Sequence, residues 1–191
     1  MHITDIIIII VQFIWGSCDF YIKKNMTANE EQADKKSYKV LYGITIISLI
    51  VGIAAGWLLK FYNIGGIYND SIYFPIIGII VILLGLFIRL SAIAKLKQYF
   101  TVNVTIREDH KLITDGLYKY IRHPAYAGGI LSFIGCGICY GNIISLIIIA
   151  LPYFILIIIR IKNEEAILTE KFGQDYINLQ KKTKKLIPYI F

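Results

Sequence analysis

The stretch AYAGGILSFIGCGICYGNIISLIIIALPYFILIIIRI, residues 125–161, decides the fold of this chain. It contains two apolar runs, at 125–140 and 143–161, and Arg160 is its one charged residue. Gly141 and Asn142 separate the runs, and such a pair is typical of a tight turn. About 20 apolar residues carry an α-helix across a hydrocarbon core of roughly 30 Å. We therefore predict an antiparallel hairpin of membrane helices whose outer ends meet at one membrane face.

Three further apolar runs precede this hairpin, at residues 3–22, 40–59 and 72–94. The chain is 57% hydrophobic and 17% charged, whereas about a quarter of the residues in a soluble domain are charged. Too few polar residues remain for a separate nucleotide-binding domain. We predict an all-α integral membrane bundle of five transmembrane helices with a cytoplasmic C-terminal helical segment. Residues 1–94 hold the first three helices, and residues 95–191 hold the polar segments and the hairpin.

Basic residues are segregated along the chain and give it a net charge of +7. Seventeen of the 20 Lys and Arg residues follow the first, third and fifth apolar runs, and Arg160 lies at the end of the fifth. Because basic loops stay in the cytoplasm, this pattern predicts an outside N-terminus and a cytoplasmic C-terminus. The basic residues flank membrane segments instead of forming one solvent face, so no nucleic-acid partner is expected.

The three cysteines, Cys18, Cys136 and Cys139, all lie within apolar runs. The last two match C-x-x-C, but a redox pair or a zinc site needs an electropositive, accessible setting or further ligands. We interpret them as small packing residues and expect no metal. Gly52 and Gly56 share a spacing that lets two helix backbones approach closely.

The polar stretch before the hairpin has a defined local geometry. Pro124 fixes its own backbone and restricts the preceding residue, so His123 is expected on a turn directly before the fourth helix. Gly116, Gly128 and Gly129 allow a close approach of the backbone. These residues together predict the wall of a pocket, although His123 alone is equally explained as a turn residue.

Arg160 and Glu164 leave the fifth helix four residues apart, so they share one helix face at the membrane boundary. A cation and an anion there can bind opposite charges on two ligands, and the hairpin brings them to the level of His123. A plain helix ion pair is the simpler alternative.

Other polar residues have ordinary explanations. Arg122 and Tyr120 are interpreted as interfacial anchors, and Arg89 as an arginine that snorkels towards the cytoplasm. Gln12 and Asp19 in the first run are expected to form hydrogen bonds between helices.

Five motifs in register resemble the isoprenylcysteine carboxyl methyltransferase family and its phospholipid methyltransferase relatives. They are Leu112-Ile-Thr-Asp-Gly116-Leu-Tyr118, Arg122-His-Pro-Ala-Tyr126-Ala-Gly128, Arg160 with Glu164-Glu165, Phe172-Gly-Gln-Asp-Tyr176 and Ile187-Pro188. The resemblance covers about residues 103–188. Leu117 departs from the proline that is frequent in bacterial relatives, and Leu179-Gln180 replaces a frequent tyrosine.

The resemblance implies an integral membrane enzyme that uses S-adenosylmethionine without a Rossmann domain. The residues that it assigns to the cofactor are His110, Lys111, Leu112, Ile113, Tyr118, His123, Pro124, Ala125, Tyr126 and Glu164. Arg160 is assigned to the substrate, and the reaction depends on Arg160 and Glu164. The implied reaction is methyl transfer to a lipid-tailed acceptor from the bilayer, most like the C-terminal carboxylate of an isoprenylated cysteine.

Several alternatives remain open at this stage. A phospholipid amine or a small thiol as acceptor needs a base, for which Glu164, Glu165 and His123 are the nearby candidates. An NADPH-dependent membrane lipid reductase needs additional basic contacts, which the lysines of the tail can supply. A small transporter or assembly factor predicts polar residues at the bilayer midplane, and apart from Gln12 the runs contain few.

Overall fold

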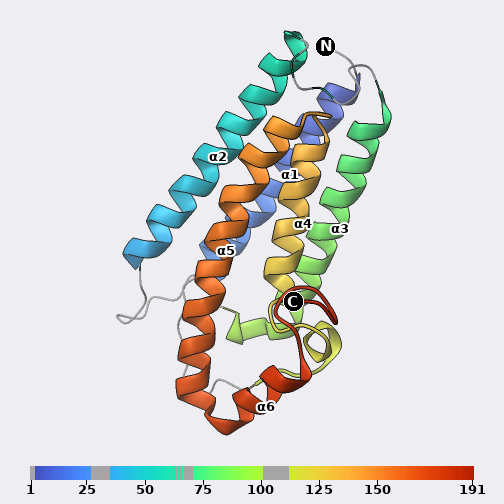
Figure 1. The fold of residues 1–191 in the computed structure, drawn as a ribbon. Helices are drawn as coiled ribbons and strands as arrows, with labels where there is room; N and C mark the ends of the chain where they lie inside the picture. Colours follow the sequence, from blue (N-terminus) through green and yellow to red (C-terminus); the bar gives the residue numbers. More distant parts are fainter. Residues whose placement is uncertain (1–2, 27–34, 63, 65, 67–70, 101–111) are drawn as a thin grey trace.

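The computed structural model describes residues 3–26, 35–62, 64, 66, 71–100 and 112–191, and all regular structure in this part of the chain is helical. Five long helices lie roughly along one axis (Figure 1): α1 (Ile3–Met26), α2 (Lys35–Phe61), α3 (Tyr73–Leu96), α4 (Pro124–Ile138) and α5 (Ile143–Phe172). Helix α6 (Gln174–Lys182) crosses below them, and two short 3₁₀ helices, η1 (Lys97–Tyr99) and η2 (Gly116–Lys119), lie between α3 and α4.

Among the described residues, three helices are long and apolar enough to cross a membrane: Tyr42–Phe61 of α2, Tyr73–Leu96 and Ile143–Phe172. The apolar segments Ile6–Ile22 and Pro124–Ile138 are shorter. Exposed large apolar side chains cover these helices, as contact with lipid requires. The prediction of an all-helical membrane protein is confirmed, whereas the count of five crossings and their orientation stay predictions.

Helices α3 and α4 pack backbone to backbone through glycines. A Cβ atom on Gly135 would lie 2.8 Å from the carbonyl oxygen of Gly78. About two helical turns from this contact, a Cβ atom on Gly128 would lie 2.5 Å from the carbonyl oxygen of Gly85. Small residues at these positions let two membrane helices approach closely where no hydrophobic force drives them together. This contact fixes the start of α4 against α3.

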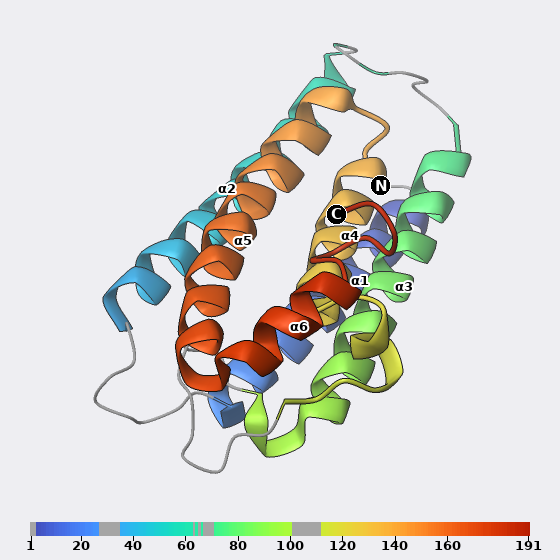
Figure 2. The ribbon, with the colours of Figure 1, turned by 60° about the horizontal axis from the view of Figure 1, so that its bottom comes forward.

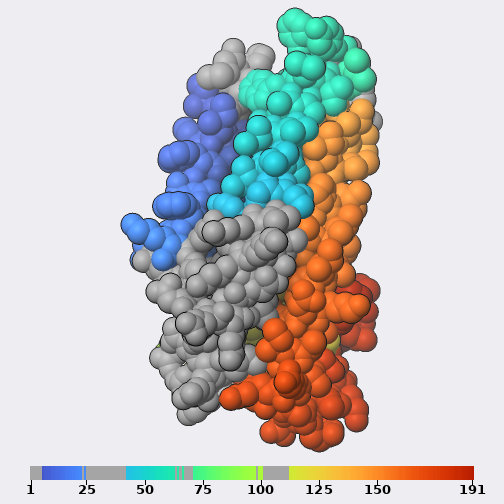
Figure 3. Space-filling view, turned by 90° about the vertical axis from the view of Figure 1, so that its left-hand side faces the viewer, coloured from blue at the N-terminus to red at the C-terminus, as the bar shows by residue number. Residues whose placement is uncertain are grey.

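The glycine pair in α2 packs as its spacing predicts. Gly56 faces Tyr140, whose Cγ atom would lie 2.6 Å from an added Cβ, and Gly52 faces Ile149. Helix α2 therefore packs on α5 and on the turn before it. Figure 3 shows α1, α2 and α5 as neighbouring columns on one face of the molecule.

The predicted turn between α4 and α5 is present. Gly141 adopts φ 57°, and the Asn142 side chain caps α5 by accepting hydrogen bonds from the amides of Ile144 (2.9 Å) and Ser145 (3.3 Å). Helix α5 continues without a break through its polar second half, so Arg160 and Glu164 lie on one helix. It ends before Gly173, whose φ of 52° favours glycine at a helix end.

Polar side chains of α1 join it to the other helices. Gln12 contacts the hydroxyl of Tyr140 at 3.3 Å, and Asp19 accepts a hydrogen bond from Arg89 at 2.7 Å. The interhelical hydrogen bond of Asp19 is thus confirmed, whereas the partner of Gln12 lies in the turn between α4 and α5. The interpretation of Arg89 as a snorkelling residue is wrong, because the nearby carboxylate of Asp19 holds its guanidinium inside the bundle.

Candidate active site

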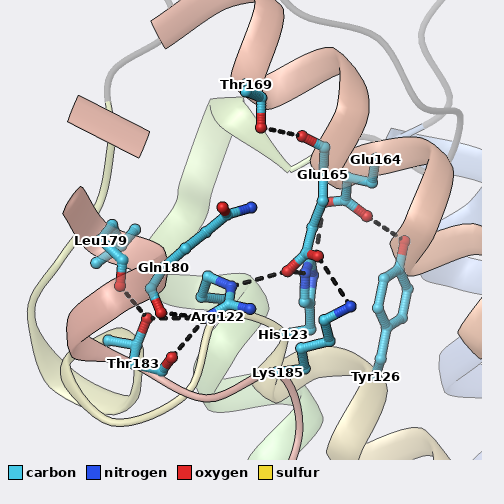
Figure 4. Close-up of polar contacts among 10 residues, drawn as sticks. All are labelled: Arg122, His123, Tyr126, Glu164, Glu165, Thr169, Leu179, Gln180, Thr183 and Lys185. Carbon is cyan, nitrogen blue, oxygen red and sulfur yellow. Dashed lines mark hydrogen bonds and ion pairs between the residues drawn. The ribbon is translucent and has the colours of Figure 1, made fainter. Parts of the chain in front are cut away.

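The polar residues gather at the end of the bundle away from the Gly141-Asn142 turn. The loop before α4, the second half of α5 and the segment after α6 meet here (Figures 2 and 4). His123 is the N-cap of α4, with φ −123° and ψ 57°, and Pro124 follows it as the first helical residue. The amide of His123 donates to the carbonyl oxygen of Lys185 at 3.0 Å, and its own carbonyl accepts from Tyr126 and Ala127. The turn that proline predicts is thereby fixed on both sides.

Tyr126 connects the two charged residues of the fifth helix. Its hydroxyl donates to Oε2 of Glu164 at 2.8 Å and accepts from Nε of Arg160 at 3.1 Å. The Arg160 guanidinium carbon also lies 5.6 Å from the centre of the Tyr126 ring. Glu164 keeps 30% of its side chain exposed, so its carboxylate is accessible to a ligand. Arg160 and Glu164 are thus connected through Tyr126 instead of forming a simple ion pair.

His123 is buried beside Tyr126 and Glu164. Its ring stacks on Tyr126, with the ring centres 5.7 Å apart and an interplanar angle of 19°. Nδ1 lies 4.0 Å from Glu164, and Nε2 lies 3.4 Å from Oε1 of Glu165. The structure thus brings His123, Tyr126, Glu164 and Arg160 into one cluster, as the hairpin predicts.

Glu165 is the centre of a second network (Figure 4). Its carboxylate accepts from Nε of Arg122 at 2.8 Å and lies 3.2 Å from Nζ of Lys185. Arg122 also donates to the carbonyl oxygens of Gln180 and Thr183, at the end of α6. The interpretation of Arg122 as an interfacial anchor is wrong, because only 7% of its side chain is exposed. Burying an unpaired guanidinium is very costly, and Glu165 compensates its charge.

The remaining predicted cofactor residues line the loop before α4. Tyr118 is buried in η2 and donates to the carbonyl oxygen of Ala92 at 3.3 Å. Burial raises the pKa of Tyr118, and the negative charge of Glu164 raises it further, so its hydroxyl stays protonated. Ile113 packs near Tyr118 and Ala125, while Pro124 is buried and Leu112 half-buried. His110 and Lys111 lie outside the described residues.

A cavity of ≈ 180 Å³ lies within the bundle next to this cluster. Its polar lining includes Asp19, Arg89, Tyr126, Tyr153 and Arg160. Its apolar lining comes mainly from α1, α2, α4 and α5 and includes Trp15, Leu49, Phe133, Leu156 and Ile157. A polar end and an apolar body suit a ligand that combines a charged group with a lipid tail.

Within the described part of the chain, no group of three or more His, Cys, Asp or Glu residues is placed to hold a metal ion. Cys136 and Cys139 are buried free thiols, and Cys136 belongs to the apolar core with Phe133. Their interpretation as packing residues is consistent with this position.

Sequence reasoning assigned Arg122 and Arg89 to the membrane interface, offered Glu165 only as a candidate base, and did not single out Lys185. The adjacency of Arg122 to His123, and of Glu165 to Glu164, was the available signal. Adjacent residues at a helix start or within a helix point in different directions. Arg122 and Glu165 can therefore form a network beside the one that contains His123 and Glu164.

Fold and site define a helical membrane protein with a charged cluster at one end and an intramembrane cavity beside it. Comparisons with known proteins show which family this architecture resembles. Residues 77–170, about half of the chain, match the model of the isoprenylcysteine carboxyl methyltransferase family. Over this region the chain is similar to that family, and the matched region includes Arg122, His123, Tyr126, Arg160, Glu164 and Glu165.

Curated relatives of this chain carry the name protein-S-isoprenylcysteine O-methyltransferase. The one from Schizosaccharomyces pombe is 37% identical over 109 residues, which are 56% of this chain and 46% of the relative. The one from Dictyostelium discoideum is 27% identical over 184 residues, which are 93% of this chain and 76% of the relative. The B form from Arabidopsis thaliana is 33% identical and matches 59% of this chain. The chain spans 46% and 58% of the lengths of the S. pombe and A. thaliana relatives.

A solved structure, of the eukaryotic intramembrane Ras methyltransferase, an isoprenylcysteine carboxyl methyltransferase, is similar in fold. Its TM-score is 0.60 at 28% identity, and the match covers 74% of this chain and 52% of that chain.

Proposed function

We propose that this protein transfers the methyl group of S-adenosylmethionine to a carboxylate on a membrane-partitioned acceptor, most like the C-terminal carboxylate of an isoprenylated cysteine. One observation carries the proposal: the Tyr126 hydroxyl joins Glu164 to Arg160 at the polar end of a cavity lined by membrane helices. The similarity to the family and the names of the relatives support it.

The donor set fits the cofactor. Glu165 is already neutralised by Arg122 and Lys185, whereas Glu164 pairs with neither of them and keeps 30% of its side chain exposed. S-adenosylmethionine, which has a sulfonium and an ammonium group, supplies an electrophilic methyl when bound. Glu164, His123, Tyr126, Tyr118 and the 110–113 segment would hold it, with the buried Pro124 and Ala125 behind them.

Arg160 would orient the acceptor. A guanidinium matches a carboxylate through two parallel hydrogen bonds, and the bond to Tyr126 fixes the orientation of Arg160. A carboxylate is ionised at neutral pH, so the acceptor needs no general base. The protein's contribution is alignment and exclusion of water, and alignment alone can supply about 7 kcal/mol or more.

The membrane arrangement follows from the same proposal. All five long helices cross the bilayer, the N-terminus lies outside, and the cluster with the C-terminal segment faces the cytoplasm. The segregation of the basic residues supports this orientation. An acceptor with a lipid tail would enter the cavity from the bilayer.

A radiolabelled methyl assay on the purified full chain tests the function. The acceptors are N-acetyl-S-farnesylcysteine, phosphatidylethanolamine and a long-chain thiol. We expect label in the prenylcysteine product that mild base releases as methanol, since only an ester behaves in this way. Label confined to the amine or the thiol would replace the carboxylate proposal, and no labelled product would overturn methyl transfer to these classes.

A further inference from the structure

After α6 the chain turns back as a hook, residues 183–191, whose first half is tied to the candidate site. The carbonyl oxygen of Lys184 accepts from the amide of Arg122 at 2.8 Å, and that of Lys185 accepts from His123 at 3.0 Å. Thr183 is buried at the start of the hook, and Leu186 is buried in the same apolar cluster as Ile161. The hook is therefore part of the folded structure.

The second half of the hook is a closed turn. The amides of Leu186 and Ile187 both donate to the main-chain oxygen of Phe191 at 2.7 Å. Tyr189 has φ 66°, a left-handed conformation that residues other than glycine adopt rarely. Such a residue persists only where its surroundings fix the backbone. The turn thus holds its side chains in defined directions.

Those side chains are large, apolar and exposed. Tyr189 is 85% exposed, Ile190 75%, Ile187 50% and Phe191 44%. The described part of the chain does not cover them, although burying such a side chain is worth about 1.5–3 kcal/mol. Figures 1 and 2 place the hook against α4, at the level where the apolar helices α3 and α4 end.

Basic residues flank this apolar tip. Lys181, Lys182 and Lys184 are exposed immediately before it. Lys184 pairs with Ile121 in an isolated bridge, next to the exposed Tyr120, over whose ring Lys119 lies at 5.9 Å. Aromatic and aliphatic side chains beside lysines are typical of segments at a membrane interface.

We infer that the hook is an interfacial membrane anchor. Tyr189 and Ile190 insert between the head groups and acyl chains of the leaflet next to the site, and Lys181, Lys182 and Lys184 contact anionic lipid phosphates. The bilayer is the occupant because the hook lies at the level of the site-side ends of the apolar helices α3 and α4, where the membrane arrangement proposed above places the lipid head groups. Because Lys184 and Lys185 bind the main chain of Arg122 and His123, the anchor joins the bilayer to the loop of the site.

Spin labels on the full chain in lipid vesicles test this inference independently of any activity. The background variant is Cys18→Ser, which leaves the two buried cysteines. A label is attached in turn to Ile190→Cys in the hook, Asp175→Cys on the exposed face of α6, and Leu83→Cys on the exposed face of α3. Collisions with oxygen report lipid, and collisions with a water-soluble nickel chelate report water.

We expect the label at 190 to favour oxygen over nickel, as the label at 83 does, while the label at 175 favours nickel. Adding phosphatidylserine to phosphatidylcholine vesicles should increase this preference at 190. The increase should disappear when Lys181, Lys182 and Lys184 are all replaced by Gln.

A label at 190 that behaves like the label at 175 would overturn the inference, because the tip would then be in water. Low collision rates with both reagents would also overturn it. In that case dipolar broadening between labels would identify a second copy of the chain as the cover. If the label at 190 favours oxygen equally with and without phosphatidylserine, the insertion of the apolar side chains is supported and the contacts of the lysines with anionic lipid are contradicted.

Discussion

The hydroxyl of Tyr126 donates to the Glu164 carboxylate at 2.8 Å and accepts from the Arg160 guanidinium at 3.1 Å. One neutral phenol thus connects an anion and a cation that stand four residues apart on α5. In the proposed reaction Glu164 serves the cofactor and Arg160 the acceptor, so Tyr126 sets the position of one relative to the other. Alignment of two reactants depends on such fixed separations.

Replacing Tyr126 by Phe should therefore lower kcat/KM for the prenylcysteine acceptor by roughly 10- to 100-fold. Hydrogen bonds to charged groups contribute about 1.5–3 kcal/mol, and this substitution removes two while keeping the ring that stacks on His123. Steady-state methyl transfer is the measurement. The exposed Tyr120→Phe is the matched control and should retain wild-type rates. Equal rates for both variants would remove Tyr126 from the alignment of the site.

Glu164→Gln and His123→Ala should each abolish the binding of S-adenosylhomocysteine to the detergent-purified chain. The first substitution removes the partly exposed negative charge, and the second removes the ring beside Tyr126. Isothermal titration calorimetry measures the affinity. Glu170→Gln, an exposed carboxylate on the same helix, should bind as the wild type does. Undiminished binding in both site variants would show that the cofactor lies elsewhere.

Arg160→Lys should reduce turnover on a carboxylate acceptor while the affinity for S-adenosylhomocysteine is retained. Lysine keeps the positive charge but lacks the planar fork that binds a carboxylate through two hydrogen bonds. The separation of kcat from cofactor affinity is the informative result, since a misfolded variant loses both. Lys162→Gln, an exposed substitution two residues further on, controls for a general effect of altered charge. Unaltered turnover would contradict the role of Arg160 in orienting the acceptor.

The sequence predicted the elements of this fold because their signals are local. Apolar runs, the Gly141-Asn142 turn and the i, i+4 spacing of Arg160 and Glu164 all act within a few residues of each other. Together with the rule that a short turn makes neighbouring helices antiparallel, they placed the His123 end beside the Arg160 end. The roles of these residues in binding stay predictions.

The charge pairs escaped prediction because they join distant parts of the chain. Arg122 and Glu165 are 43 residues apart, and Asp19 and Arg89 are 70 apart. A single arginine near the end of an apolar run is explained equally well by snorkelling. Only the packing of α1 against α3, and of α5 against the loop before α4, shows where each partner lies.

The pair of Asp19 with Arg89 gives the last prediction, which concerns stability. Asp19→Ala should destabilise the protein by about 3–5 kcal/mol, because it leaves the Arg89 guanidinium inside the bundle without its carboxylate partner. The double variant Asp19→Leu with Arg89→Met should recover most of this loss, since it removes both charges. Reversible unfolding in mixed detergent micelles measures these differences. Asp115→Ala, which breaks the exposed pair with Lys95, is the control and should leave stability unchanged. A double variant that is no more stable than Asp19→Ala would show that Arg89 stabilises the bundle through its other contact, the hydrogen bond to the carbonyl oxygen of Ala125 at 3.2 Å.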